Sequence, residues 1–221
     1  MKNAVATMLL KILFYPSPKV MISKDEEKQF NDLYEEALKR RDKLIEYNLP
    51  VPKYKFLYYI SQNKPIVFHG SNNKLIDSFE PREQTLFNGK IATAVFATKD
   101  SIWSIFYAIL EKGKISGNIR NGSLSTNNQK TFHFYSLTKS TALNNPWTSG
   151  MVYFLPEDSF LYLGKGTIHF NEWICKKTVL YIAKLEVEPI DFYFLNKVAT
   201  HHPEESIFKS WLMYKFRTLF K

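Results

Sequence analysis

Apolar residues between Asp25 and Leu49 recur every three or four positions, and Pro50 follows directly. This spacing places them on one side of a helix, so it predicts a single amphipathic helix over residues 25–49. Either Ser23 or Asp25 can cap the first turn, because short polar side chains accept hydrogen bonds from the free N–H groups there.

Three further helices are predicted. The opening MKNAVATMLLKILFYPSPK contains an apolar stretch that Lys11 interrupts; it has no cleavage pattern and is too short to span a bilayer, so we expect a helix packed on the domain. In DSIWSIFYAILEKG, Asp100 can cap the first turn and Gly113 can be left-handed after the last. From Pro203 onward we expect a helix with acidic residues in its first turn and basic residues later.

The pattern changes to strands between Pro65 and Pro189. Six segments there are rich in β-branched and aromatic residues and are bounded by turn formers: PIVFHG, TAVFAT, TFHFYSL, MVYFLP, TIHFNEWI and TVLYIAKLEV. Such segments predict a mainly antiparallel sheet assembly. Together with the helices, they indicate an α+β fold.

Two stretches, residues 113–130 and 138–150, are rich in Gly, Ser, Thr and Asn and contain few apolar residues. We expect both to be long loops, either covers over a site or mobile insertions. Deletion of residues 113–130 is predicted to alter ligand access more than stability, because few apolar contacts would be lost.

Composition limits the possible classes of protein. The chain has 221 residues, 45% of them hydrophobic, so it can bury a sizeable core as one domain or as one domain with an extension. A net charge of +9 is weak support for an anionic partner, because the lysines are scattered along the chain. Cys175 is the single cysteine; we interpret it as a small core residue, and the absence of a disulfide favours a reducing cytoplasm.

The five histidines show neither the H-E-x-x-H pattern nor Cys/His spacing, so no metal site is predicted. His201 and His202 precede the last helix, and we expect both at the surface. The G-x-S-x-G, P-loop and G-x-G-x-x-G patterns are also absent, which removes the motif arguments for hydrolases, nucleotidases and Rossmann proteins. His69 remains, in a polar His-Gly-Ser triplet directly after the apolar run Ile66–Phe68.

Three segments together resemble a known family. VFHGS on a strand (67–71), AVFATKDSIWSIFYA running from strand into helix (94–108), and FNEWI on a late strand (170–174) occur in the order of the ADP-ribosyltransferase fold. The resemblance is to its His-aromatic-Glu version, shared by poly-ADP-ribose polymerases and diphtheria-type toxins. It covers residues 65–189. The order of FEPR, VFAT and EW also resembles that in small uncharacterised proteins of Gram-positive bacteria.

The resemblance implies NAD as a substrate, held in a cleft between two apposed, mainly antiparallel sheets. His69 would hydrogen-bond the ribose on the nicotinamide side, and the Gly70 backbone would pair with the carboxamide. A glycine would let the flat ring approach closely. Ser71 would add a hydroxyl contact, and Ser104 matches the small hydroxyl residue that touches the carboxamide.

The remaining implied roles belong to aromatic and acidic residues. Phe96 and Tyr107 would sandwich the nicotinamide, with Phe106 as the alternative in register. Glu172 would orient a ribose hydroxyl and stabilise the positive charge that develops as nicotinamide leaves. The resemblance thus makes His69, Glu172 and Tyr107 the catalytic candidates.

The sequence departs from the family pattern at two points. Where the family usually carries a strand tyrosine, this chain has Val95 or Phe96, and neither supplies a hydroxyl. Position 170 is Phe, whereas arginine-modifying members have a second glutamate there, so arginine is disfavoured as the acceptor. Independently of the family, Arg82 and Gln84 follow the predicted cleft loop, where the guanidinium could bind the NAD pyrophosphate.

Two alternatives stay open. A domain that kept the fold and lost the chemistry could bind nucleic acid or a protein through the last helix, using its four basic residues Lys209, Lys215, Arg217 and Lys221. The simpler interpretation is that the apolar residues of that helix dock it on the core: Ile207, Phe208, Trp211, Leu212 and Phe216. The RNA 2′-phosphotransferase branch of the fold also has a His-Gly pair, but the basic residues it requires do not match here.

The predicted organisation has an N-terminal helical extension (1–62), an ADP-ribosyltransferase-like domain (63–195) and a C-terminal helix (196–221). The acceptor, a protein or a nucleic acid, and the oligomeric state do not follow from the sequence.

Overall fold

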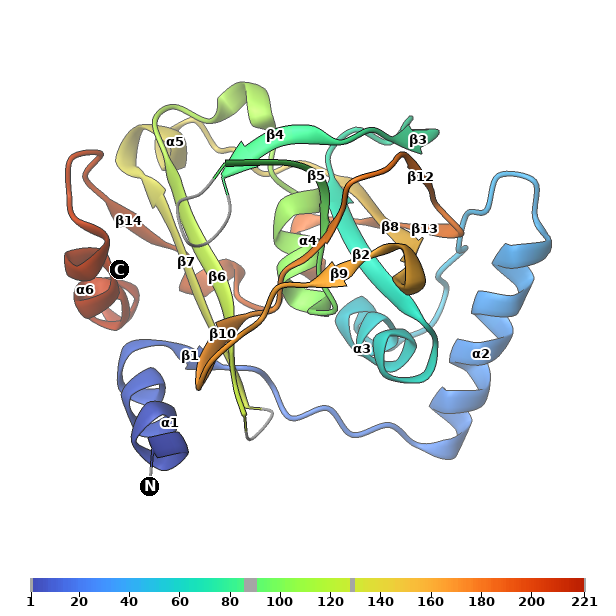
Figure 1. Ribbon diagram of the computed structural model, residues 1–221, viewed down its shortest axis with the longest axis horizontal. Helices are drawn as coiled ribbons and strands as arrows, with labels where there is room; N and C mark the ends of the chain where they lie inside the picture. The colour runs from blue at the N-terminus through green and yellow to red at the C-terminus, as the bar shows by residue number, and fades with distance from the viewer. Residues whose placement is uncertain (1, 86–90, 128–129, 221) are drawn as a thin grey trace.

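The computed structural model describes residues 2–85, 91–127 and 130–220, which form an α+β fold with several antiparallel sheets (Figure 1). The α-helices of the described residues are α1 (Lys2–Leu13), α2 (Lys24–Lys39), α3 (Lys53–Asn63), α4 (Ser101–Ala108), α5 (Lys139–Leu143) and α6 (Ile207–Leu219). Short 3-10 turns are η1 (Lys112–Lys114), η2 (Glu157–Ser159), η3 (Pro189–Asp191) and η4 (Leu195–Lys197).

The largest sheet contains the order β1-β7-β6-β10, and β14 pairs parallel to β7. Its strands are β1 (Tyr15–Pro16), β6 (Ile119–Thr126), β7 (Thr131–Thr138), β10 (Ile168–Phe170) and β14 (Ala199–His201). All pairings along the β1-β7-β6-β10 path are antiparallel, and the β6–β7 hairpin pairs Ile119 with Leu137 and Ser125 with Thr131.

The other strands form three smaller sheets. One has the order β13-β8-β2, another β4-β5-β11-β9, and the third pairs β12 with β3. Their bounds are β2 (Ile66–Ser71), β3 (Ser78–Phe79), β4 (Arg82–Thr85), β5 (Ile91–Ala97), β8 (Gly150–Pro156), β9 (Leu161–Tyr162), β11 (Trp173–Cys175), β12 (Val179–Leu180) and β13 (Ala183–Val187). A single antiparallel bridge between Phe68 and Thr98 joins β2 to the end of β5.

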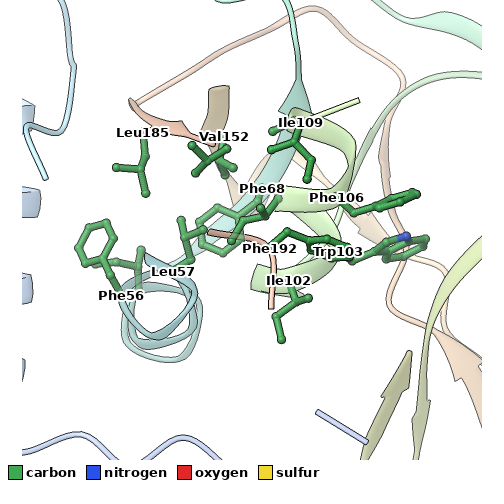
Figure 2. Packing of buried hydrophobic residues seen from close by; sticks show 14 of the residues in the cluster. Phe56, Leu57, Phe68, Ile102, Trp103, Phe106, Ile109, Val152, Leu185 and Phe192 are labelled. Carbon is green, nitrogen blue, oxygen red and sulfur yellow. The ribbon is translucent and has the colours of Figure 1, made fainter. Parts of the chain in front are cut away.

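Helix α4 packs in the middle of these strands (Figure 1). Its Phe106 is fully buried, with its ring centroid 4.6 Å from that of Tyr135 in β7. Figure 2 shows Phe106 and Ile102 of α4 in the same core as Phe68 of β2 and Phe56 of α3. Residues of α2 and α3 therefore share one core with the strands.

The cap predicted for α4 is present. Asp100 Oδ1 accepts a hydrogen bond from the Trp103 N–H at 2.7 Å, and Oδ2 accepts one from the Ser123 hydroxyl at 2.7 Å. One carboxylate thus starts α4 and ties it to β6. The left-handed conformation predicted at Gly113 is wrong: the helix ends at Ala108, and Gly113 lies in η1.

The single helix predicted over 25–49 is wrong in its second half. Helix α2 begins after Ser23, whose side chain forms a capping box with Glu26, and it ends at Lys39. The segment after α2 cannot continue as a helix to residue 49, because Lys43 adopts a positive φ of 55° and Leu44 bridges to Lys184 of β13. Helix α3, which the sequence analysis did not predict, returns the chain to β2.

Both predicted loops contain a regular element. Residues 113–130 contain β6, and residues 138–150 contain α5. Ser123, Leu124 and Ser125 of β6 are buried, so the expectation of a loop with few packing contacts is wrong, and deletion of residues 113–130 should destabilise the fold. Strand β6 pairs with β7 on one side and with β10 on the other. These backbone hydrogen bonds stabilise it as a strand, although its side-chain pattern does not predict one.

Helix α6 begins at Ile207 with Ser206 as its cap, so Pro203 and the acidic residues precede the helix. The side chains that pack inward are Ser210, Tyr214 and Thr218, whereas Ile207, Phe208, Leu212 and Phe216 are exposed. Apolar docking by those four residues is therefore wrong, and only Trp211 of the expected set packs on the core.

Expectations for four further features, Cys175, His201, His202 and helix α1, can be compared with the structure. Helix α1 packs through Leu10 beside Phe14, as expected, and Cys175 is buried. His202 is exposed, but the surface position expected for His201 is wrong, because its ring is buried between Ser136 and Asn118. In the described part of the chain, no helix is long and apolar enough to cross a membrane.

Candidate functional site

The site begins where β2 and β5 separate. Phe68 exchanges two backbone hydrogen bonds with Thr98, at 2.7 and 2.9 Å, and the two strands share no further bridge. Because backbone groups alternate along a strand, the N–H and C=O of Gly70 point to the same edge as those of Phe68. They therefore face the gap that opens between β2 and β5, on the side away from β8.

A cavity of about 260 Å³ occupies this gap. It is lined by residues from β2, β4, β5, α4 and η1 and from the segment between β10 and β11. Among the residues named from sequence, the cavity brings together His69, Gly70, Gln84, Phe96, Ser104, Tyr107 and Glu172. Phe68, Ala97, Thr98, Trp103 and Lys112 complete the lining.

The His69 side chain is held by a backbone carbonyl of β5. Its Nδ1 lies 2.7 Å from the Phe96 carbonyl oxygen. A carbonyl only accepts, so Nδ1 carries the proton and Nε2 of the neutral ring is left as an acceptor. Burial lowers the His69 pKa to about 4, and the nearby cations Lys112 and Arg82 add to that shift. The imidazole is therefore neutral at pH 7.

Tyr107 lies one residue after the fully buried Phe106, and the structure puts Tyr107, rather than the alternative Phe106, at the cavity. Burial raises the Tyr107 pKa to about 12, and the nearby charge of Glu172 also raises it. A hydrogen bond to Asn121 acts in the opposite direction and lowers the pKa. Asn121 also accepts a 2.6 Å hydrogen bond from the Trp103 indole N–H. Because its pKa is about 12, the Tyr107 phenol is neutral at pH 7.

Glu172 occupies the place where the chain passes from one sheet to another. Residues 168–170 pair with β6, and residues 173–175 pair with β5. The single strand expected for TIHFNEWI is therefore wrong, because the segment breaks at Asn171 and Glu172. The break is fixed by Asn171, whose Oδ1 accepts from the Lys99 N–H at 3.0 Å. The Glu172 side chain is 9% exposed and lines the cavity.

The expected reason for a glycine at position 70 was the close approach of a ligand ring, but the structure shows a different reason. A Cβ built at this position would lie 2.0 Å from the Ser104 carbonyl oxygen and 2.7 Å from the Ala108 nitrogen. The missing side chain therefore lets β2 contact the backbone of α4 rather than making room for a ligand ring. Ser104 itself is buried, and its hydroxyl donates to the Ser101 carbonyl at 2.8 Å.

Ser71 and Arg82 do not line this cavity. They line an adjoining one of about 70 Å³, which shares His69, Phe96, Gln84 and Lys112 with the first. Ser71 accepts a hydrogen bond from the Asn73 N–H at 3.2 Å, so its hydroxyl already has a backbone partner. Val95 also faces this second cavity, while Phe96 contributes to both.

Sequence reasoning did not name five of the lining residues: Phe68, Ala97, Thr98, Trp103 and Lys112. Trp103 lies one helical turn before Tyr107, with ring centroids 6.1 Å apart, so helical spacing could have indicated it. No pattern marks Lys112, which reaches the cavity because the chain turns through η1 after α4.

A larger, open groove of about 710 Å³ lies elsewhere, along residues 16–20 and beside α3. It contains Lys11, Lys19 and Lys130, but also the carboxylate of Asp100 that caps α4. None of the site residues predicted from sequence lines it. The described residues contain no group of three or more His, Cys, Asp or Glu side chains that could hold a metal ion.

Comparison of the chain with family models, with curated proteins and with solved structures found no match.

The site can be described by its chemistry. It offers a neutral imidazole acceptor, a neutral phenol, a carboxylate, aromatic rings and the backbone edge of Gly70 around one small concavity. Small-molecule sites commonly combine apolar walls with a few convergent polar groups of this kind. A backbone N–H beside a C=O pairs with a primary amide, and a carboxylate stabilises a cation formed next to it.

Proposed function

We propose that the cavity binds the nicotinamide end of NAD, and that the protein releases nicotinamide and transfers ADP-ribose to a protein or nucleic-acid acceptor or to water. One observation carries the proposal. His69, Phe96, Ser104, Tyr107 and Glu172 line a single cavity, although they come from β2, β5, α4 and the segment between β10 and β11. These are the residues that the ADP-ribosyltransferase resemblance names for this task.

The size of the cavity fits part of the dinucleotide. A volume of about 260 Å³ is below the usual range for a complete drug-sized ligand. Nicotinamide and its ribose would fill it, and the pyrophosphate would extend past Gln84. Arg82 and Lys112 are close enough to His69 to lower its pKa, so their charges would lie near the two phosphates.

Each wall has a role in this proposal. The Gly70 N–H and C=O would pair with the carboxamide, as the resemblance implies. Phe96 and Tyr107 would pack on the nicotinamide ring. Because His69 Nδ1 donates to Phe96, Nε2 would accept a hydrogen bond from a ribose hydroxyl.

The reaction needs little covalent chemistry from the protein. The bond between the ribose carbon and the pyridinium nitrogen breaks, nicotinamide leaves with the electron pair, and the ribose becomes oxocarbenium-like. Glu172 would stabilise that charge until a nucleophile adds to the same carbon and releases its proton. Positioning and electrostatics would supply most of the rate enhancement.

The nucleic-acid-binding alternative has less support. Of the four cations it requires, Arg217 is paired bidentately with Glu205 at 2.7 and 2.6 Å, and Lys215 donates to the Lys11 carbonyl. Lys221 lies outside the described residues, so Lys209 is the one exposed cation of that set within them.

Titration of NAD into the purified protein tests the site. His69→Ala removes the acceptor and should weaken NAD binding at least tenfold, about 1.4 kcal/mol, since one hydrogen bond and the packing of the ring are lost. The matched control is His202→Ala, which removes an exposed histidine outside the cavity and should leave binding unchanged.

Melting curves of both variants separate lost binding from lost folding. If the wild-type protein binds no NAD but retards nucleic acid in a salt-sensitive way, the binding-module alternative replaces this proposal.

A further inference from the structure

Helices α1 and α6 expose an unusual apolar surface. Nine side chains on it are between 49% and 73% exposed: Val5, Met8, Leu9, Ile12, Phe208, Leu212, Phe216, Leu219 and Phe220. We call these nine residues the apolar terminal face. Large apolar side chains exposed singly are ordinary, but a contiguous group marks a binding surface.

The face follows the period of each helix. In α6, Phe208, Leu212 and Phe216 recur every four residues, while Ser210, Tyr214 and Thr218 pack inward. This is the reverse of a helix that docks on a core through its apolar side.

In α1, Val5, Met8, Leu9 and Ile12 lie on the side opposite the buried Leu10. Each helix therefore turns most of its apolar residues outward.

The two helices lie against each other at one end of the molecule (Figure 1). Phe14, directly after α1, makes an edge contact with Trp211 of α6, with ring centroids 5.8 Å apart. Lys215 of α6 donates a hydrogen bond to the Lys11 carbonyl of α1. The outward residues of both helices thus belong to one end of the fold.

The charges around the face have one sign. Neither α1 nor α6 contains an aspartate or glutamate. Lys11 and Lys209 are exposed, and the sequence adds Lys221 two residues after the end of α6. The carboxylates next to α6 in the sequence are Glu204, which is exposed, and Glu205, whose side chain is buried. Glu205 is paired with Arg217, which lowers the Glu205 pKa to about 2.

We propose that the apolar terminal face docks the protein on the surface of a membrane that contains anionic lipids. Interfacial helices combine Phe and Leu on one face with lysines beside it, and they lack acidic residues. A protein partner fits less well, because lysine is depleted in protein interfaces. The face would insert its Phe and Leu side chains at the headgroup boundary, with Lys11 and Lys209 near the lipid phosphates.

Co-sedimentation with vesicles tests the proposal, using phosphatidylcholine alone and phosphatidylcholine with about one third phosphatidylserine. The wild-type protein should sediment with the anionic vesicles. Leu212→Ser/Leu219→Ser should reduce that binding about tenfold or more. The control Leu75→Ser/Ile190→Ser changes two leucine-sized exposed residues outside α1 and α6 and should bind as wild type.

Charge reversal supplies the second arm. Lys11→Glu/Lys209→Glu should also weaken binding about tenfold, whereas Lys28→Glu/Lys39→Glu on α2 should have a smaller effect. Equal sedimentation of all variants, or none with anionic vesicles, would overturn the proposal. A dimer in solution that Leu212→Ser/Leu219→Ser dissociates, without vesicle binding, would assign the face to a second copy of the chain instead.

Discussion

Adjacent residues of α4 have opposite environments, and this decides which aromatic ring can meet a ligand. Phe106 is fully buried against Tyr135, whereas Tyr107 lines the cavity. The sequence left both open, because two consecutive aromatic residues satisfy the same helical spacing. Only the packing of α4 between β2 and β7 selects one of them.

Buried histidines predict a pH dependence of folding. His201 donates from Nε2 to Asn118 and accepts at Nδ1 from Ser136, so its ring is neutral in the fold. Burial lowers the His201 pKa from 6.5 to about 4. The unfolded state therefore binds more protons between these values, and stability is complete above about pH 6.5 and falls as the pH decreases toward 4.

Urea unfolding at about pH 7 and pH 5 measures this contribution. We expect His201 to account for about 2 kcal/mol of the loss between the two, so His201→Asn should have a correspondingly smaller pH slope. His202→Asn, which changes an exposed ring, should keep the wild-type slope. Identical slopes for wild type and His201→Asn would mean that the His201 ring is already accessible to protons in the fold.

At the scale of elements, strands were predicted correctly where a segment is rich in β-branched and aromatic residues. PIVFHG, TFHFYSL and MVYFLP all correspond to strands, and Asp100 caps α4. Prediction failed for β6, whose sequence IRNGSLST reads as a loop because its pairing with β7 and β10 is not encoded locally. Tertiary pairing overrides local propensity in such strands.

The contact between β2 and α4 gives a prediction at this scale. Gly70→Ala places a Cβ 2.0 Å from the Ser104 carbonyl oxygen, so the helix must move away from the strand. We expect a loss of about 2–4 kcal/mol in the free energy of unfolding, measured by urea denaturation.

Gly113→Ala is the matched control, because a Cβ there meets no atom within 4 Å. It should change stability by less than about 1 kcal/mol. Equal stability of the two variants would contradict the close approach of β2 to α4.

At the scale of the whole molecule, the candidate site exists only through long-range assembly. Its residues run from His69 to Glu172, and the cavity forms because β2 separates from β5 while the chain breaks between β10 and β11. The resemblance named half of the lining residues, but no sequence pattern could place Lys112 there. Nor could a pattern reveal that α6 turns its apolar side outward, because the same spacing ordinarily indicates a buried face.

Nicotinamide release is the most direct measurement of the central claim. Purified protein is incubated with NAD labelled in its nicotinamide ring, and free nicotinamide is followed over time. The wild-type protein should release nicotinamide. Glu172→Gln, which keeps the shape of the side chain but removes its charge, should lower turnover about a hundredfold, about 3 kcal/mol, with little change in NAD binding. Release by Glu172→Gln at the wild-type rate, or no release by the wild-type protein, would contradict the account.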